Sequence, residues 1–326
     1  MNEVLPDMFS LSIPMPTKPG DYVNSYLVRG NKKCLLIDTG WRTPEAFDSL
    51  KKQLAEIGVR LDNISRIVAT HIHPDHYGLV GKLKQFSNAT IYLHYREVEF
   101  INSRYINMDA LIQHVETLLS VNGVPPGEMP EMGKAFAGIE PVLPDVILRG
   151  GEQINFNRFH FQVLWTPGHS AGHICLYEPE QRVLLTGDHV LPAIATNVGL
   201  NPQSDFNPLK EYLDSLDTLS QLDVSLVLPG HGYPFTNLKQ RIEQLNQHYK
   251  QRNSEILATL KDTPKTVYQI ARQIAWYSST GSGLDGLGAW ERRMAILETF
   301  SHMEAMRADG MVDKMAVGKI ILYERR

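Results

Sequence analysis

Three histidines and one aspartate lie within six residues, and this cluster constrains the chain more than any other feature. They form the sequence HIHPDH at 71–76, directly after a short apolar segment, RIVAT, that predicts a buried strand. Imidazole nitrogens suit zinc and its first-row neighbours, and a carboxylate adds negative charge. In a tight turn, His71 and His73 can point to one side. Asp75 and His76 then point to the other, so the segment predicts two metal ions a few ångströms apart rather than one.

Three further residues complete this metal-binding pattern. His169, Asp188 and His231 each follow an apolar segment and are each preceded by glycine, which lets the backbone turn sharply. The apolar segments predict strands over 159–166, 183–186 and 224–228. A single histidine of this kind is more often an ordinary core or surface residue, so only the complete set favours a metal site. Seven candidate ligands then divide evenly, with three on each ion and Asp188 shared between them.

The rest of the sequence predicts an α/β protein with an appended helical module. Strands predicted over 26–29 and 34–38 precede a helix that begins at Pro44, and another helix is predicted over 208–220. The pattern loosens over 96–146, which is predicted to be a cap or insert of a catalytic domain, 1–236. The remaining residues, 237–326, predict three helices followed by a hairpin, which is the order of a winged-helix module.

Composition excludes several classes of protein. The chain has 326 residues and a formal net charge of -4, so it lacks the strongly basic balance of many nucleic-acid-binding proteins. We expect no membrane association, because no apolar run approaches the length of a membrane-spanning helix. The first residues lack the pattern of a secretory signal. Cys34 and Cys175 lie in apolar segments and are expected to be buried thiols, which predicts a cytoplasmic location.

The histidine and aspartate motifs resemble those of the metallo-β-lactamase superfamily of metallohydrolases. HIHPDH matches its HxHxDH motif, and the GH, GD and GH pairs that end at residues 169, 188 and 231 follow in the expected order. The resemblance covers about 1–236 and implies a four-layer αβ/βα sandwich with the metal site at one edge. It assigns the ligands as follows: His71, His73 and His169 to the first metal, Asp75, His76 and His231 to the second, and Asp188 to both. The implied cofactors are two divalent ions, with Zn²⁺ expected first and Mn²⁺ or Fe²⁺ as alternatives.

The carboxyl-terminal module narrows the resemblance to one branch. It is similar to the glyoxalase II and lactamase-beta-2-like proteins, the latter ending in a winged helix. The segment PGHSAGH at 167–173 is similar to glyoxalase II, but the basic glutathione-binding residues of that enzyme have no assigned counterpart. Related diiron reductases carry glutamate where this chain has His73, which argues against that activity. A mononuclear iron dioxygenase is disfavoured.

The expected activity is hydrolysis by metal-activated water. Two divalent ions lower the pKa of water toward about 7 and polarise the substrate oxygen. Asp75 is the candidate catalytic residue, because it is expected both to coordinate metal and to orient the nucleophile or carry a proton. The favoured substrate is a small carbonyl compound, either a thioester, an ester or a lactone.

Two alternative functions follow from the same residues. One is an endoribonuclease or phosphodiesterase of the lactamase-beta-2-like type. Residues 1–236 hold 18 Lys and Arg against 26 Asp and Glu, which disfavours a polyanion, although 237–326 hold 14 against 10. The other is a winged-helix regulator that binds DNA. Its predicted recognition helix, 289–307, carries three arginines (292, 293 and 307) but also three glutamates and an apolar stripe, which favours packing.

Other residues are assigned supporting roles. His173 and His189 neighbour ligands and are candidates for orienting them. Methionines and a phenylalanine in or near the cap are candidates for an apolar pocket: Met108, Met129, Met132 and Phe136. Asn197, Asn201 and Asn207 are expected near the mouth of the cleft. The appended helices also suggest a homodimer.

Overall fold

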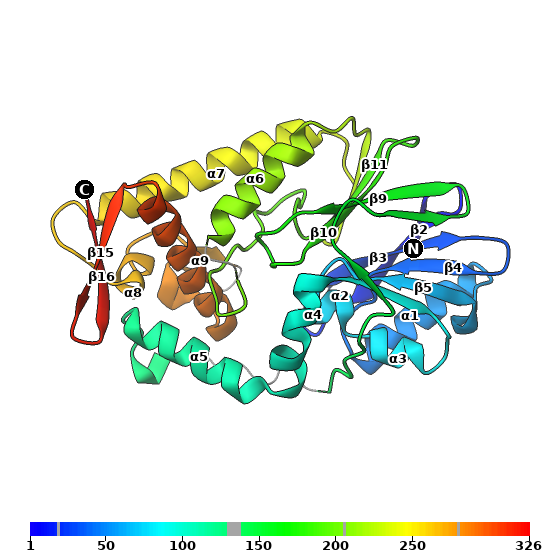
Figure 1. Cartoon of the computed structure of the whole chain (residues 1–326), viewed down its shortest axis with the longest axis horizontal. Helices are drawn as coiled ribbons and strands as arrows, with labels where there is room; N and C mark the ends of the chain where they lie inside the picture. The colour runs from blue at the N-terminus through cyan, green and yellow to red at the C-terminus, as the bar shows by residue number, and fades with distance from the viewer. Residues whose placement is uncertain (18–19, 129–137, 205–206, 279–280) are drawn as a thin grey trace.

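Two β-sheets face each other in the computed structural model, which describes residues 1–17, 20–128, 138–204, 207–278 and 281–326 (Figure 1). The first sheet has the order β1-β2-β3-β4-β5-β6-β7 and the second β12-β11-β10-β9-β8. The strands of the first sheet are β1 (Asn2–Leu5), β2 (Met8–Pro14), β3 (Tyr22–Arg29), β4 (Cys34–Ile37), β5 (Ile64–Val68), β6 (Thr90–His94) and β7 (Val146–Leu148). Those of the second are β8 (Gln153–Phe156), β9 (Phe159–Trp165), β10 (Ile174–Glu178), β11 (Val183–Gly187) and β12 (Leu226–Pro229).

Alternate residues of each central strand face different layers. In β4, Leu35 and Ile37 pack between the two sheets, whereas Cys34 and Leu36 pack against helices on the outer face. The strand is fully apolar because both of its faces are buried, as is usual for a strand in the middle of a sandwich. In β10, Ile174 and Leu176 face the space between the sheets in the same way, and Cys175 faces outward.

Helices cover the outer face of each sheet. The first sheet is covered by α1 (Pro44–Glu56), α2 (Pro74–Tyr77) and α3 (Val80–Lys84), and the second by α6 (Pro208–Ser220) and α7 (Leu238–Thr259) (Figure 1). Thr43 starts α1, because its side chain accepts a hydrogen bond from the Ala46 N–H and Pro44 fits the first turn. These layers confirm the predicted four-layer αβ/βα sandwich.

The direction of the strands gathers their carboxyl ends at one edge. β4, β5, β6 and β7 pair in parallel, as do β11 and β12, while the other pairs are antiparallel. Parallel neighbours end on the same side of their sheet, so the loops after β11 and β12 lie together. The strand β9 ends there too, because both β9 and β11 are antiparallel to β10. The Ile174 N–H at the start of β10 donates to the Thr70 carbonyl after β5, so the loop after β5 lies at the same edge of the sandwich.

The carboxyl-terminal region has the predicted order of three helices and a hairpin. It contains α7, α8 (Val267–Ala271), α9 (Ala289–Ala308), β15 (Val312–Val317) and β16 (Ile320–Arg325). The short elements β13 (Tyr277–Ser278), β14 (Gly281–Ser282) and η5 (Leu284–Gly286) precede α9. Its description as a winged helix, and the boundary at residue 237, stay predictions.

The segment predicted as a cap contains several helices. These are α4 (Tyr95–Ile101), the π-helical turn η2 (Asn102–Ile106), α5 (Met108–Val121) and the short turn η3 (Pro126–Glu128). Three leucine and valine side chains of α5 join the hydrophobic cluster formed by α8, α9 and the final hairpin: Leu111, Val115 and Leu119. The insert therefore packs with the carboxyl-terminal helices. Met129, Met132 and Phe136, expected in an apolar pocket, lie outside the described residues.

A short turn, η1 (Leu61–Asn63), leads into β5.

Among the described residues, no helix has both the length and the apolar character needed to cross a lipid bilayer.

Candidate metal centre

Three histidines form one compact group at the edge of the sandwich. His71 and His73 follow β5, and His169 follows β9. The Nδ1 atom of His73 lies 2.9 Å from Nε2 of His71 and 3.0 Å from Nε2 of His169. Three ring nitrogens therefore converge on one point, and they belong to the three residues that the family resemblance assigns to the first metal.

The hydrogen bonds behind these rings direct lone pairs toward that point. His169 donates from Nδ1 to the Asn197 carbonyl at 2.9 Å, which leaves its Nε2 as an acceptor when the ring is neutral. His71 has the same arrangement, because its Nδ1 lies 3.0 Å from a Thr70 hydroxyl that itself donates to Asp38. His73 has only one Nδ1 proton at most, so it cannot satisfy both neighbouring lone pairs. A cation bound between the three nitrogens would satisfy them all, so this group fits a metal ion.

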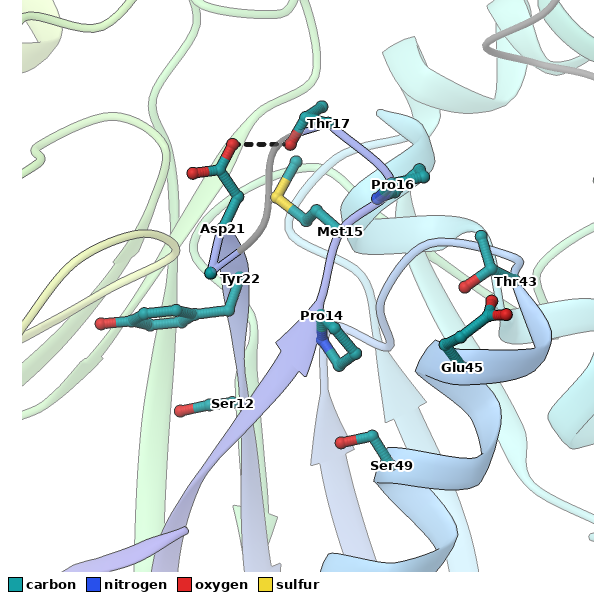
Figure 2. A pocket seen from close by; sticks show the side chains of 11 residues that line it. Ser12, Pro14, Met15, Pro16, Thr17, Asp21, Tyr22, Thr43, Glu45 and Ser49 are labelled. Atoms are coloured by element: carbon teal, nitrogen blue, oxygen red, sulfur yellow. Dashed lines mark hydrogen bonds between the residues drawn. The ribbon is translucent and has the colours of Figure 1, made fainter.

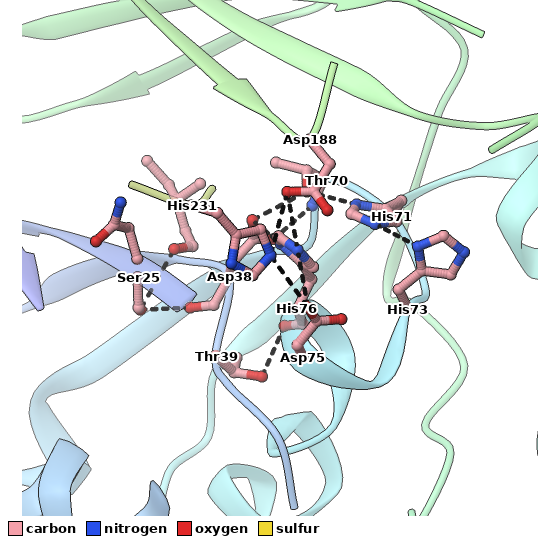
Figure 3. Close-up of polar contacts among 12 residues, drawn as sticks. Ser25, Asp38, Thr39, Thr70, His71, His73, Asp75, His76, Asp188 and His231 are labelled. Atoms are coloured by element: carbon pink, nitrogen blue, oxygen red, sulfur yellow. Dashed lines mark hydrogen bonds and ion pairs between the residues drawn. The ribbon is translucent and has the colours of Figure 1, made fainter. Parts of the chain in front are cut away.

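Four side chains form a second group beside the first: Asp75, His76, Asp188 and His231 (Figure 3). Nε2 of His231 lies 3.1 Å from Oδ2 of Asp75 and 3.5 Å from Oδ1 of Asp188. Nε2 of His76 lies 3.3 Å from the same Asp188 oxygen, yet neither atom has a hydrogen-bond partner among the described residues. Both rings are held from behind, since Nδ1 of His231 donates to the Tyr22 carbonyl and Nδ1 of His76 to Asp38.

Asp188 lies between the two groups. Its Oδ1 faces His76 and His231, whereas its Oδ2 lies 3.7 Å from Nε2 of His169. One carboxylate thus presents an oxygen to each group. The structure brings all seven predicted residues together, and both groups are able to hold metal ions.

The pKa values in the second group reflect the concentration of negative charge. Burial opposes protonation of His231, but the Asp188 and Asp75 carboxylates outweigh it and raise its pKa to about 10. The pKa of His76 is raised well above its usual range in the same way, by Asp188, Asp38 and Asp75 against burial. In the first group, burial and the neighbouring rings lower the pKa of His71 and of His73. The second group therefore takes up protons when no other cation is bound, and the first does not.

Metal binding to the second group is expected to weaken as the pH falls. His231 and His76 bind protons below their raised pKa values, and a metal ion needs the same Nε2 lone pairs. For each proton that the metal ion displaces, its apparent affinity is expected to rise about tenfold when the pH rises by one unit. Zinc titrations against a competing chelator between pH 6.5 and 8.5, with calorimetry in buffers of different ionisation enthalpy, measure this release. An affinity that does not change with pH would contradict the assigned proton competition.

Asp38 organises the first loop, a role that the sequence did not indicate. It follows β4, is buried, and adopts a positive φ of 58°. Its carboxylate accepts hydrogen bonds from the Thr70 N–H at 2.8 Å, the Thr70 hydroxyl at 2.9 Å and Nδ1 of His76 at 2.8 Å. It therefore fixes both the strand end before His71 and the ring of His76.

Glu97 on α4 joins two of the ligand loops and was also missed. Its side chain is buried, with Oε2 accepting from the Ile72 N–H at 2.9 Å and Oε1 from the Gly172 N–H at 2.7 Å. One carboxylate therefore ties the loop of His71 and His73 to the loop of His169. A glutamate inside an ordinary amphipathic helix carries no local sequence signal for such a role.

The glycines before the ligands serve two different purposes. Gly168 and Gly187 have positive φ values of 129° and 47°, which favour glycine. Gly230 does not, but a Cβ there would lie 2.5 Å from Oδ1 of Asp188. Its lack of a side chain lets the His231 loop approach the centre.

Of the two histidines predicted to orient ligands, only His173 is seen to contact one. Its Nε2 accepts a hydrogen bond from the Asp188 N–H at 3.2 Å, and its Nδ1 pairs with the Thr166 hydroxyl. The His189 ring is buried against Tyr212, and burial lowers its pKa to about 3. Neither nitrogen of that ring has a hydrogen-bond partner among the described residues.

A cavity of about 240 Å³ opens onto the two groups. Asn197 and Asn201 line it as expected, whereas Asn207 instead caps α6 by accepting from the Lys210 N–H. Met108, which was expected in an apolar pocket, is not among the described residues that line this cavity. Two other methionines, Met15 and Met294, line it instead. Apolar walls come from α5 and α9, whose residues there are Leu111, Val115, Trp290, Met294 and Leu297.

A second cavity, of about 720 Å³, lies at the turn between β2 and β3 beside the start of α1 (Figure 2). Its walls include Tyr22, Glu45, and a Thr17 hydroxyl that donates to Asp21 at 2.7 Å. None of its described lining residues is a candidate ligand. The smaller cavity is therefore the candidate substrate site.

Comparisons with known proteins agree with this geometry. The sequence profile of the metallo-beta-lactamase superfamily matches residues 19–231. The "Probable metallo-hydrolase YqjP" of Bacillus subtilis is 29% identical over 98% of both chains. The "Acyl-coenzyme A thioesterase MBLAC2" of Bos taurus is 29% identical over 71% of this chain and 79% of its own.

The same fold is found in a solved structure of comparable length. The metallo-beta-lactamase family protein TTHA1429 from Thermus thermophilus superposes with a TM-score of 0.84 and 33% identity, covering 99% of this chain and 100% of its own. The family profile covers well over half of the chain, and it spans all seven candidate ligands. The chain therefore belongs to the metallo-beta-lactamase superfamily of metallohydrolases.

Proposed function

We propose that this protein hydrolyses a small carbonyl substrate, a thioester, ester or lactone, with two divalent metal ions bound at its seven candidate ligands. The observation that carries the proposal is the meeting of both ligand groups at the mouth of a small, largely apolar cavity. We assign the two ions to zinc, because five of the seven ligands are imidazoles. When bound, such ions lower the pKa of water and polarise a carbonyl oxygen.

The protein's own residues hold and orient the reactants. Asp75 is our candidate catalytic residue, because it lines the cavity and its Oδ2 lies 3.1 Å from Nε2 of His231. From that position it is placed to orient a water molecule and to take its proton. The surrounding apolar walls exclude other water from the carbonyl, which strengthens the electrostatic interactions inside the site.

The cavity favours a small acyl compound over a nucleic acid. Leu111, Val115 and Leu297 form walls suited to a hydrocarbon chain. A relative named as an acyl-coenzyme A thioesterase supports a thioester substrate. The helix predicted to read DNA, α9, is buried from Ala295 to Met306, so mainly its ends, one of them with Trp290, are exposed to a DNA groove.

Initial rates on a matched panel test this proposal. Zinc- and manganese-loaded protein would be assayed on an aryl ester, an acyl thioester, a lactone, a phosphodiester and a short single-stranded RNA, with Asp188→Ala as the blank. We expect a carbonyl substrate to be hydrolysed fastest. Preference for the phosphodiester or RNA would refute the small-substrate proposal.

We further propose a cytoplasmic location and a homodimer. The two cysteines, Cys34 and Cys175, are buried and free, which suits a reducing compartment. The dimer would use the carboxyl-terminal helices, and light scattering of the purified chain measures it directly.

A further inference from the structure

Two arginines outside the ligand loops line the same cavity as the candidate metal ligands. Arg104 comes from η2 and Arg293 from α9, and the cavity they share also contacts His73 and Asp188. A molecule in the cavity therefore meets the metal groups and both arginines. Neither arginine is used by the proposed hydrolysis.

Arg293 is buried without an ion-pairing partner among the described residues. It is 6% exposed, and its Nε and Nη1 atoms have no hydrogen-bond partner in the same part of the chain. Its guanidinium lies 5.5 Å from the centre of the Trp290 ring. Burial, helped by the nearby Arg104, lowers the pKa of Arg293 to about 10, so the side chain still carries its charge at neutral pH. A buried charge without a counter-charge is costly, and such groups normally pair or bind a ligand.

One carboxylate on the same helix and one in the cavity wall are engaged elsewhere. Glu298, on the same helix, accepts a hydrogen bond from Asn197 at 2.8 Å, and burial raises its pKa to about 7. Asp188 faces the histidines of the metal groups. Neither carboxylate forms a described ion pair with Arg293, so its charge is left for a molecule in the cavity.

The neighbouring Arg292 provides a contrast on the same helix. Its Nη1 lies 3.9 Å from Oε2 of Glu128, and its Nη2 donates to the Leu287 carbonyl at 3.4 Å. Arg292 is also absent from the described lining of the cavity. An arginine at this end of α9 therefore has partners within the protein when it points away from the cavity.

Arg104, the second arginine of the cavity, is held in place by hydrogen bonds to Gln203. Oε1 of Gln203 accepts hydrogen bonds from its Nε at 2.9 Å and its Nη2 at 2.6 Å. Gln203 in turn donates to the Ser103 hydroxyl at 2.8 Å, which fixes the amide. These hydrogen bonds orient the Arg104 guanidinium, which lines the same cavity as Arg293.

We infer that Arg293 and Arg104 bind a compact oxyanion of the substrate, a carboxylate or a phosphate, beside the candidate metal centre. Guanidinium groups bind either oxyanion through paired hydrogen bonds. Because it concerns the substrate, this inference rests on the proposed hydrolysis. It requires that the hydrolysed compound carry a negative charge on the part that enters the cavity. The apolar walls then receive the carbon chain between the oxyanion and the reacting carbonyl.

A set of thioesters with four-carbon acyl groups tests this inference, because the negative charge lies on the acyl group, on the thiol part or on neither. The zinc-loaded protein, Arg293→Met and Arg292→Met would be assayed with N-acetylcysteamine thioesters of butyrate and of succinate, and with butyryl phosphopantetheine. We expect one of the two anionic thioesters to be preferred over the neutral one, and which one it is identifies the oxyanion. Arg293→Met should lower kcat/KM for that substrate by about 10- to 100-fold and change the neutral substrate by less than about twofold. Arg292→Met should change neither.

Two further measurements separate the possible failures. Glutarate and inorganic phosphate would be titrated into the loaded protein with intrinsic tryptophan fluorescence as the signal, since Trp41 and Trp290 both line the cavity. Arg293→Met should weaken binding of at least one of them by about tenfold or more. Arg293→Met should also keep or raise the melting temperature, because it removes an unpaired buried charge. If no thioester is cleaved but this binding loss is seen, the hydrolysis proposal fails and the oxyanion site stands. If thioesters are cleaved without regard to charge, or Arg293→Met affects all of them equally, the oxyanion site is refuted.

Discussion

Replacing Asp188 by asparagine is expected to remove most of the hydrolytic activity while the fold is retained. Its two oxygens face different groups, with Oδ1 3.3 Å from Nε2 of His76 and Oδ2 3.7 Å from Nε2 of His169. Asparagine keeps the shape of the side chain, but it is neutral and offers only one oxygen. Substituting residues that merely orient metal ligands typically costs 10- to 100-fold in metal affinity or activity. Loss of a shared ligand should therefore lower kcat/KM by more than about 100-fold.

Metal content and turnover need to be measured on the same preparation. We expect Asp188→Asn to bind less metal per chain than the unmodified protein in equilibrium dialysis. Asp223→Asn is the matched control, since that carboxylate is 72% exposed and pairs with Arg182 at the surface. Full metal content with unchanged turnover in Asp188→Asn would refute a shared ligand at this position.

Replacing Glu97 by alanine is expected to lower the free energy of unfolding more than the other substitutions proposed for this protein. The substitution leaves the buried N–H groups of Ile72 and Gly172 without their acceptor. Each unsatisfied buried donor costs about 1–3 kcal/mol, so we expect the free energy of unfolding to fall by about 2–6 kcal/mol. Because both N–H groups belong to ligand loops, metal affinity should fall as well.

Urea denaturation of the metal-free and zinc-loaded forms measures both effects. Glu99→Ala is the control on the same helix, because Glu99 makes a surface ion pair with Arg96 and should change stability by less than about 1 kcal/mol. Glu97→Gln should recover part of the loss, since one carboxylate oxygen is kept. An unfolding free energy equal to that of the unmodified protein in Glu97→Ala would show that the two loops do not depend on this carboxylate.

The sequence predicted the ligands because their spacing is local and their chemistry is specific. Four short motifs at strand ends carried the family resemblance, and that resemblance implied the grouping of His71 with His169, which lie 98 positions apart. Several central strands were equally clear, since segments buried on both faces, such as β4 and β10, read as continuous apolar runs. The strands β1, β2, β6, β7 and β8 were not predicted. Of these, β1 has no buried residue and β8 alternates exposed with buried residues, so neither reads as a continuous apolar run.

The supporting residues were not predictable because their role depends on tertiary contacts. Glu97 reaches Gly172 across 75 positions, and Asp38 reaches His76 across 38. Arg293 appeared in the sequence as one of several charges on an amphipathic helix, and only the packing of α9 against α5 places it in the cavity. Residues grouped in short motifs leave a pattern in the sequence, whereas residues brought to the site by tertiary packing do not.

The order in which the chain is synthesised separates ligand assembly from completion of the cavity. His231 is the last of the seven candidate ligands, but Arg293 and Leu297 on α9 enter the ribosome exit tunnel more than fifty residues later. A nascent chain that has exposed His231 therefore carries all seven candidate ligands before the α9 wall of the cavity has been made. A metal ion captured at that stage of translation would therefore be bound before the substrate cavity is complete.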